Sequence, residues 1–527
     1  MFKRSGAVLA LLLALTACGA ERPDRRTGPA EVAKVTWGLD SGPRALDPAR
    51  AYDGKSALIY QQVYDSLLYL DGAGRLVPGL ALSWSQPDRL TYVYKLRTDA
   101  VFWDGKPVTA QDAAFSLERH TDDAVASEFG AYFGAVRSVK ATSADTVTVK
   151  LSRPDPFFRY VPALAGQVLQ RSFVGANPKG FGTAQVGTMG SGPYKVESFS
   201  PATGATLVRN DRWWGAKPQV ARLEFKVVSD PETLRLAVQS GDIDGTFLSD
   251  PSLSRRWRGL RSATVTWGPS PQSVYLSFDV TSPPFDDARV RRAIAMSVDR
   301  GNLARALFDG HARVAASITA PDIWSGLAPE QAGADQVRSL YDGLPGLPFD
   351  ATKAAAELAA SKHPKGFAVS VPYPASMKWL GDVLQNTAQN LKPLGVELTP
   401  RQVPFQEYIG RLYGKEKLGL QIIPYTPDYP DPAAIPSLVL GGGAFNTARF
   451  TTPELERLLA AQSTAKPGER VEGLQKILTT LADEMPYAPL FHPDLGLALN
   501  NRLALPDGTS VWLNFSQQWA TRLRAAD

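Results

Sequence analysis

Residues 92–119 read YVYKLRTDAVFWDGKPVTAQDAAFSLER and combine a strand, a turn and a capped helix in one short stretch. Every second residue from Tyr92 to Leu96 is apolar, which is typical of a strand with one buried face. The sequence DGKP at 104–107 predicts a turn. Thr109 has Asp112 three residues later, which is the pattern of a capping box, so a helix is expected to begin here and to run to Arg119.

Strand-like and helix-like segments alternate on both sides of this stretch without an internal repeat. Alternating or β-rich runs predict strands, and apolar residues three and four apart predict helices. Strands are expected at Val32–Leu39, Leu90–Arg97, Thr146–Leu151, Tyr194–Ser198, Ala205–Arg209, Ala368–Val371, Val396–Pro400 and Gly419–Pro424. Further helices are expected at Ser56–Leu70, Pro231–Ser240, Asp287–Val298, Ala351–Ser361, Met377–Leu391, Pro453–Gln462 and Glu469–Asp483. This mixture predicts an α/β protein with more than one lobe.

The composition is that of a soluble protein with a large core: 44% of the 527 residues are hydrophobic and 21% are charged. The net charge of +5 comes from interspersed charges, so no nucleic-acid partner is expected. A single cysteine excludes an intramolecular disulfide. Beyond the N-terminus, no stretch approaches the roughly 20 apolar residues of a membrane span.

The N-terminus has the pattern of an export signal. Lys3 and Arg4 precede an apolar run over Ala7–Ala17, which is too short to span a bilayer. Cys18 follows directly, and the junction resembles the lipoprotein box of bacteria, which implies acylation of Cys18 and cleavage before it. We therefore expect a signal peptide at 1–17 and a lipid-anchored tether at 18–31, polar and rich in Arg, Pro and Gly. A plain secretory signal with a chance cysteine is the alternative.

Motifs of catalysis are missing from the chain. Its four histidines, His120, His311, His363 and His492, lie far apart and lack the spacing of metal ligands. No HExxH, CxxC or GxSxG string is present. A Ser-His-Asp site assembled from distant residues stays open. We expect no metal, no cofactor and no enzymatic activity.

Residues 49–56, ARAYDGKS, match a relaxed phosphate-loop pattern in which Ala49 replaces the first glycine. A phosphate loop needs a buried strand before it and several glycines, so that backbone N–H groups converge on the phosphate. Here Leu46-Asp47-Pro48 precedes the match, and only Gly54 gives backbone freedom. We interpret the match as a coincidence.

Seven segments along the chain point to a known family. They are LDPARAYDGKSALIYQQVYDSLLYLDGAGRLVPGLALSW at 46–84, the stretch at 92–119, GSGPYKVESF at 190–199, LVRNDRWWG at 207–215, LAVQSGDIDG at 236–245, PPFDDARVRRAIAMSVDR at 283–300 and DYPDP at 428–432. In this order they resemble the extracellular solute-binding proteins of ABC importers that take up oligopeptides, dipeptides and nickel complexes. The resemblance covers nearly the whole mature chain.

The resemblance implies a fold of the type II periplasmic-binding-protein class, with two lobes that close on a cleft and an extra inserted lobe. Lobe I is then discontinuous and is drawn from residues 30–62, 189–278 and 496–527. Lobe II is expected at 63–188 and lobe III at 279–495. Gly190, Gly192 and Pro193 would allow a tight crossover where the chain returns to lobe I.

Asp428 is the first candidate for ligand binding. In PYTPDYPDP it matches the family position whose carboxylate meets the free α-amino group of a peptide. A buried carboxylate needs a partner, and an ammonium group supplies a positive charge and three donors. The alternative is a turn-forming aspartate among prolines, a role that Asp431 fits better.

Aromatic residues are expected to make most of the remaining pocket, since flat rings give contact area at low entropic cost. Core packing is the alternative for each of them. The candidates fall in segments that resemble the cleft-lining regions of the family, and they are Tyr425, Phe405, Phe129, Tyr132 and Trp379.

One departure from the family pattern concerns the peptide carboxylate. Oligopeptide binders carry an arginine shortly before the Asp-Tyr string, whereas this chain reads Gln421-Ile422-Ile423-Pro424. Arg411 lies further upstream and could compensate. Longer peptides, capped peptides or non-peptide solutes therefore become more plausible.

These observations together predict a lipid-anchored, monomeric binding protein on the outer face of the cytoplasmic membrane. It would capture a peptide-like solute by hinge closure and deliver it to the permease subunits of an ABC importer. The first alternative keeps the fold but changes the solute to a metal–chelator complex, an oligosaccharide or a siderophore-like molecule. A secreted hydrolase and a lipoprotein that binds a ligand without transporting it are the others.

Overall fold

The computed structural model describes residues 31–326, 333–414, 417–443, 445–462, 466–506, 508 and 518–526. The expected signal peptide at 1–17, the lipidation residue Cys18 and all of the tether except Glu31 lie outside the described residues. In the described ranges, none of the helices combines the length and apolar character that a bilayer crossing requires.

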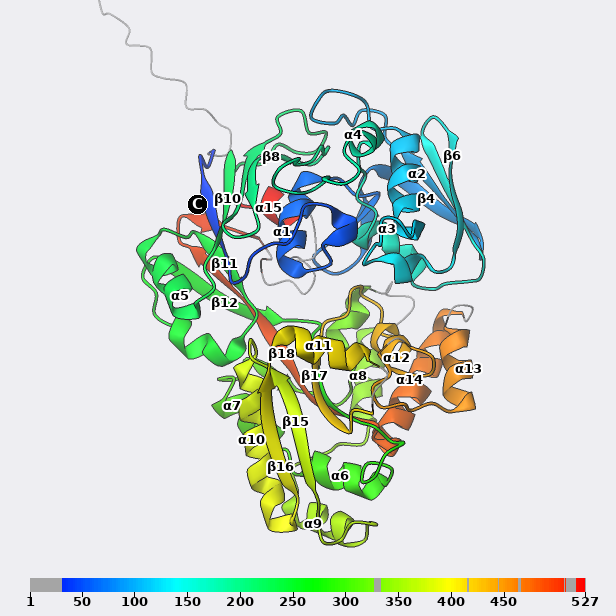
Figure 1. Cartoon of the computed structure of the whole chain (residues 1–527), viewed down its shortest axis with the longest axis vertical. Coiled ribbons are helices and arrows are strands. Elements are labelled where there is room, and N and C mark those ends of the chain that lie inside the picture. The colour runs from blue at the N-terminus through cyan, green and yellow to red at the C-terminus, as the bar shows by residue number, and fades with distance from the viewer. Residues whose placement is uncertain are drawn as a thin grey trace, which may run out of the picture.

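A ten-stranded sheet runs through both halves of the molecule (Figure 1). Its main path runs β17 (Leu420–Tyr425), β13 (Ser273–Phe278), β18 (Tyr487–Asn500), β11 (Gly245–Leu248), β1 (Val35–Leu39), β10 (Arg222–Val227), β9 (Gly204–Arg209) and β8 (Tyr194–Ser200). Two further strands, β12 (Ala263–Pro269) and β14 (Ala312–Val314), also pair with β18. The sheet is mixed, because β1 is parallel to β10 and β11 whereas β18 is antiparallel to its neighbours.

Strand β18 belongs to both halves of the molecule. Residues 494–500 pair with β12 and residues 496–499 with β11, next to a core that contains Trp37, Ile59 and Trp519. The first half of β18 pairs with β13 and β14, next to the core formed with α6 and α10. Figure 1 shows this strand running from the upper half of the molecule into the lower half.

A separate four-stranded sheet carries the stretch at 92–119. Its order is β4 (Ala81–Asp88), β5 (Thr91–Leu96), β7 (Thr146–Leu151) and β6 (Val136–Ser143). Tyr92, Tyr94 and Leu96 are buried, as their alternation predicts. Helix α2 covers this sheet, and the capping box of Thr109 and Asp112 is present.

The helices surround these sheets, and three two-stranded pairs complete the fold (Figure 1). The helices are α1 (Gly54–Val63), α2 (Ala110–Glu118), α3 (Val161–Leu164), α4 (Arg171–Ala176), α5 (Pro231–Ser240), α6 (Ala288–Met296), α7 (Arg300–Ala306), α8 (Ala334–Asp342), α9 (Ala351–Ala359), α10 (Lys378–Leu391), α11 (Phe405–Tyr413), α12 (Ala434–Val439), α13 (Pro453–Ala461), α14 (Pro467–Glu484) and α15 (Gln518–Thr521). The strand pairs are β2 (Leu68–Leu70) with β3 (Leu76–Pro78), β15 (Ala368–Pro374) with β16 (Glu397–Val403), and β19 (Leu503–Ala504) with β20 (Arg524–Ala525).

The single helix expected over Ser56–Leu70 is wrong in its second half. Helix α1 ends at Val63, and Leu68 begins strand β2. The apolar spacing continues across this boundary because Ile59 and Val63 are buried in one core while Leu67 is buried in the core of the four-stranded sheet. The periodicity therefore spans two cores rather than one helix face.

Two glycines pack against the end of α1 where the chain comes back from the four-stranded sheet. A Cβ added at Gly190 would lie 2.0 Å from the Val63 carbonyl oxygen, and one at Gly192 would lie 2.7 Å from the Val63 carbonyl carbon. The Gly192 N–H also donates to this oxygen at 3.0 Å. The two crossings of the chain thus lie side by side, which requires residues without a side chain.

We expect Gly190→Ala to lower the free energy of unfolding by about 1–3 kcal/mol, because backbone atoms must shift to admit the methyl group. Urea denaturation followed by circular dichroism would measure this loss. Gly175→Ala is the matched control, since a Cβ there meets no atom within 4 Å and the residue lies in helix α4. Its expected effect is neutral or slightly stabilising, and an equal loss in both variants would contradict the packing argument.

Candidate functional site

Three tyrosine hydroxyls converge on the carboxylate of Asp428. Tyr52 donates to Oδ1, and Tyr132 and Tyr425 donate to Oδ2, the last at 3.2 Å. The Tyr52 and Tyr132 hydroxyl oxygens lie 3.2 Å apart. Segments far apart in the sequence therefore meet at one acidic side chain, which is half-buried.

The turn that carries Asp428 follows β17, whose last residue is Tyr425. Below it, the buried Asp431 carboxylate accepts from Arg470 at 2.5 and 2.6 Å and from the Ala433 N–H at 3.0 Å. The hydroxyl of Tyr160 donates to the Pro430 carbonyl oxygen at 3.1 Å. An ion pair and a tyrosine thus hold the turn just after Asp428.

Tyr52 is positioned by an ion-pair cluster between the start of the chain and the segment before Tyr132. The Tyr52 N–H donates to Glu128 Oε2 at 2.8 Å, and Arg44 donates to Glu128 Oε1 at 3.0 Å. Its ring lies 4.7 Å from the ring of Phe129, measured between centroids. Tyr52 nevertheless remains 40% exposed, so its ring is available to a ligand.

Further rings extend this cluster toward the four-stranded sheet. Tyr429 lies edge-on to Tyr132 with centroids 6.4 Å apart and stacks on Tyr160 at 5.5 Å. Phe157 lies 5.1 Å from Tyr429. The surroundings of Asp428 are therefore flat, apolar rings with hydroxyl groups at their edges.

Burial raises the pKa of Asp428 above its usual range, and the three tyrosine hydroxyls oppose this shift by hydrogen bonding to the charged form. Burial and the nearby carboxylate also raise the pKa of Tyr52 and of Tyr425, so both hydroxyls stay protonated donors. In the described part of the chain, no lysine, arginine or histidine is paired with Asp428. This carboxylate has neutral donors only and lacks a cation.

The structure brings together four of the residues that the sequence singled out: Asp428, Tyr425, Tyr132 and Phe129. Phe129 is 1% exposed, and its ring packs against the ring of Tyr52.

The other three candidates form no hydrogen bond with Asp428 within the described residues. Trp379 lies on helix α10 and is buried in the core, where its ring lies 5.4 Å from that of Phe308. Phe405 begins helix α11 with 44% of its surface exposed. Arg411 is half-buried on the same helix, and its Nε has no hydrogen-bond partner among the described residues.

Tyr52 was not among the candidates from the sequence, because its segment indicated only a family motif and a chance match to a phosphate loop. Helix α1 begins at Gly54, and the Asp53 side chain accepts from the Ser56 N–H at 2.8 Å. A carboxylate therefore occupies the helix N-terminus, where a phosphate would bind. Tyr429 had a local signal in its position next to Asp428, whereas no local signal distinguishes Tyr160 from a core tyrosine.

Few of the side chains near Asp428 could ligate a metal ion or a cofactor. Within the described ranges, no group of three or more His, Cys, Asp and Glu side chains is arranged to hold a metal ion. The polar groups at Asp428 are hydroxyls and one carboxylate, which suit hydrogen bonding to a cationic or polar organic solute.

The class of protein follows from comparison with known families. Residues 75–447, more than half of the chain, match the family described as Bacterial extracellular solute-binding proteins, family 5 Middle. The chain therefore belongs to the bacterial extracellular solute-binding proteins of family 5, a class of binding proteins rather than enzymes.

Among curated proteins, the chain is similar to the periplasmic murein peptide-binding protein MppA of Escherichia coli, with 23% identity over 486 residues, covering 88% of each chain. Among solved structures, it is similar to the ABC transporter substrate-binding protein CtaP of Listeria monocytogenes, with a TM-score of 0.81, 22% identity and coverage of 94% and 100%. It is also similar to DppA of Helicobacter pylori in complex with the peptide STSA, with a TM-score of 0.79, 19% identity and coverage of 94% and 99%. These structures confirm the type II periplasmic-binding-protein fold.

Proposed function

We propose that the chain binds a peptide-like solute with a free amino terminus and delivers it to the permease of an ABC importer. The observation that carries this proposal is the Asp428 carboxylate, which is enclosed by tyrosine hydroxyls and has no cationic partner in the described part of the chain. An ammonium group is the complement that such a site lacks, since charge-assisted hydrogen bonds are roughly twice as strong as neutral ones. The peptide named for MppA and the peptide bound to DppA support the same class of solute.

We infer that the ligand is enclosed by closure of the two halves of the molecule. Tyr52 and Tyr132 reach Asp428 from the upper half, whereas Asp428 itself follows β17 of the lower half. Strands β12, β13 and β18 connect the halves, and the chain crosses between them near residues 270–272 and 492–493. A ligand that bridges Asp428 and the tyrosines would stabilise the closed state by its higher affinity for that state.

A peptide solute also has a carboxylate end, which needs a cationic side chain of its own. Gln421, which stands where oligopeptide binders have a cation nearby, is buried and donates to the Leu418 and Leu420 carbonyl oxygens. Arg411 makes no ion pair within the described residues and keeps an unpartnered Nε. We propose Arg411 as the cation that meets the solute carboxylate when that group is present.

The proposal also concerns the cellular location of the protein. The family is extracellular by its description, and the resemblance of the N-terminus to the lipoprotein box supports anchoring through a lipid on Cys18. The protein would then act as a monomer tethered to the outer face of the cytoplasmic membrane.

The test compares trialanine with N-acetyl-trialanine and trialanine amide by calorimetric titration of the mature chain. Acetylation removes the ammonium charge and is expected to weaken binding about a hundredfold, because Asp428 is then left without its cation. Amidation of the carboxyl end tests Arg411 independently of Asp428.

Equal affinity for the free and the acetylated peptide would contradict the assignment of Asp428 to the amino terminus. Native mass spectrometry followed by denaturing release then identifies what the protein carries. A released non-peptide mass would keep the family and the fold but would replace the peptide by another solute.

A further inference from the structure

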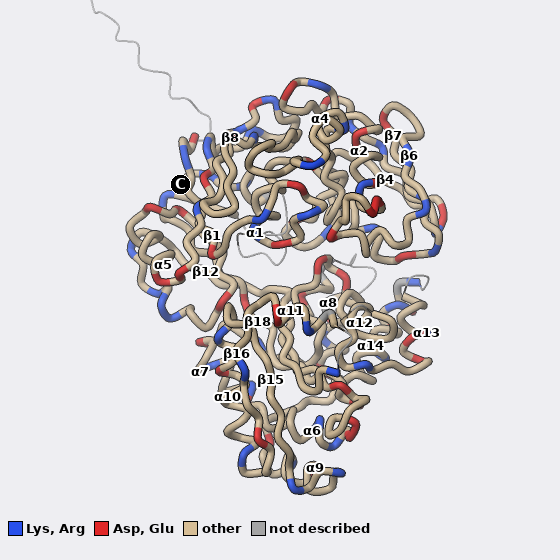
Figure 2. Tube along the Cα trace, viewed as in Figure 1, with Lys and Arg blue, Asp and Glu red and all other residues tan. Residues whose placement is uncertain are grey.

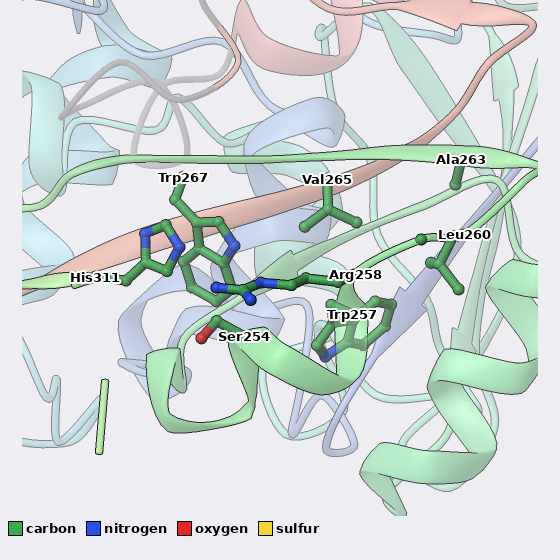
Figure 3. A pocket seen from close by; sticks show the side chains of 9 residues that line it. Ser254, Trp257, Arg258, Leu260, Ala263, Val265, Trp267 and His311 are labelled. Atoms are coloured by element: carbon green, nitrogen blue, oxygen red, sulfur yellow. The ribbon is translucent and has the colours of Figure 1, made fainter. Parts of the chain in front are cut away.

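A pocket whose lining does not include Asp428 lies against β12 (Figure 3). It has a volume of about 410 Å³ and is formed by the 3-10 helix η5 (Pro251–Trp257), the loop after it, strand β12 and His311. This volume is at the lower end of the range for ligand pockets. The pocket therefore has room for one small organic molecule.

The wall of this pocket contains polar groups without partners. Ser254 is 2% exposed, and its hydroxyl has no hydrogen-bond partner among the described residues. The indole N–H groups of Trp257 and Trp267 donate no hydrogen bond within the described part of the chain either. Buried polar groups normally have partners, so an unpaired hydroxyl in a pocket wall indicates an acceptor that a ligand supplies.

Two guanidinium groups lie beside the pocket. Arg258 and Arg255 share the single carboxylate of Asp309. His311 lies 3.6 Å from Asp494 and stacks on Trp267 with ring centroids 5.0 Å apart. Figure 3 shows the Arg258 guanidinium directed toward Ser254 and Trp267. Elsewhere positive and negative residues are interspersed over both halves of the molecule (Figure 2).

The rest of the lining is apolar and flat. The Trp257 and Trp267 rings both line the pocket; in the view of Figure 3 Val265 lies between them and Leu260 lies beyond Trp257. Indole rings and aliphatic side chains favour an aromatic body, and the donors around Ser254 favour an oxygen anion.

We propose that this pocket binds a small aryl carboxylate, with the ring between the two tryptophans and the carboxylate at Ser254 and Arg258. The site is independent of the peptide site. His311 precedes β14 of the lower half, while the other lining residues belong to η5, the loop after it and β12, so the ligand would contact both halves next to β18.

The test is fluorine NMR of para-fluorophenylacetate titrated with the mature chain. Saturable broadening of the fluorine signal is the expected result, and para-fluorobenzyl alcohol, which lacks the carboxylate, is expected to bind about tenfold more weakly. Excess trialanine is expected to leave the signal unchanged. Displacement by the peptide would place the probe at Asp428 instead and overturn the proposal.

Two variants locate the probe in the pocket. Val265→Trp fills the pocket and is expected to abolish binding, and Arg258→Gln removes the charge from an exposed side chain without altering the core. Leu236→Trp adds the same ring on the exposed face of α5 and is expected to bind as the parent protein does. Circular dichroism shows whether each variant is folded. A titration without saturation, or unchanged binding in Arg258→Gln, would overturn the proposal.

Discussion

Replacing Asp428 with Asn is expected to weaken trialanine binding by about 3 kcal/mol, roughly a hundredfold. Tyr52 and Tyr132 donate to different oxygens of Asp428. The amide keeps one acceptor oxygen and places N–H donors at the other position, where a tyrosine hydroxyl can accept, so the shape of the side chain is kept while the negative charge is lost. The ammonium group of the peptide would then be desolvated without a counter-charge. Calorimetric titration measures the difference directly.

Asp286→Asn is the matched control for this variant, because Asp286 is exposed and pairs with Lys362 at 3.0 Å on a distant surface. It is expected to bind trialanine with unchanged affinity. A loss of less than about threefold in Asp428→Asn would contradict the role of the charge.

The pH dependence of the affinity for trialanine also distinguishes the parent protein from Asp428→Asn. Burial raises the pKa of Asp428, so the folded, ligand-free protein binds this proton more tightly than the unfolded chain does. Acidification through the raised pKa therefore stabilises the ligand-free protein through this group and weakens binding of the ammonium group. In Asp428→Asn the affinity should lack this acid-side fall.

Arg119→Met is expected to lower the free energy of unfolding by about 3–5 kcal/mol, because it leaves the Asp47 carboxylate buried without its partner. The guanidinium donates to both Asp47 oxygens at 3.0 and 2.9 Å, and both residues are less than 10% exposed. The pair joins the segment before Tyr52 to the end of helix α2. Urea denaturation followed by circular dichroism measures the change.

Arg292→Met is the control for this prediction. Its pair with Glu357 has an N–O distance of 3.3 Å and side chains that keep 30% and 28% of their surface exposed. Solvent screens this pair, so the expected loss is below about 1 kcal/mol. Similar losses in the two variants would show that burial is not the cause.

Local patterns predict the elements of this fold well. Strand β7 and helix α5 have the expected bounds, Thr146–Leu151 and Pro231–Ser240, because their alternation or amphipathicity is interrupted at both ends. In α5 the end is set by Gly241, which has a positive φ of 85°. The ends of such elements are determined by local residues and can be predicted from the sequence.

Strand β18 was not predicted, and its residues explain why. Its sequence YAPLFHPDLGLALN is buried on nearly every residue, so the alternation of a half-exposed strand is missing. It also contains Pro489 and Pro493, which argue against an interior strand. Its pairing with β11, β12, β13 and β14 depends on segments distant in the sequence.

The candidate site was predictable in part. The resemblance to the family indicated Asp428, and Tyr425 and Tyr132 do contact it. Composition alone does not separate an aromatic residue near the site from one in a core, and Trp379 belongs to a core. Tyr52 was missed because only the fold brings residue 52 next to residue 428.

The prolines of β18 bear on how easily this strand can bend. A strand shared by two halves resists bending to the extent that bending breaks hydrogen bonds, and proline has no N–H to contribute. Pro493 lies at the crossing, Pro489 lies four residues before it in the strand, and Pro269 faces Asp494 from β12. If the halves close on a ligand as proposed, we expect the bend to fall at these prolines, where the fewest backbone hydrogen bonds would be lost.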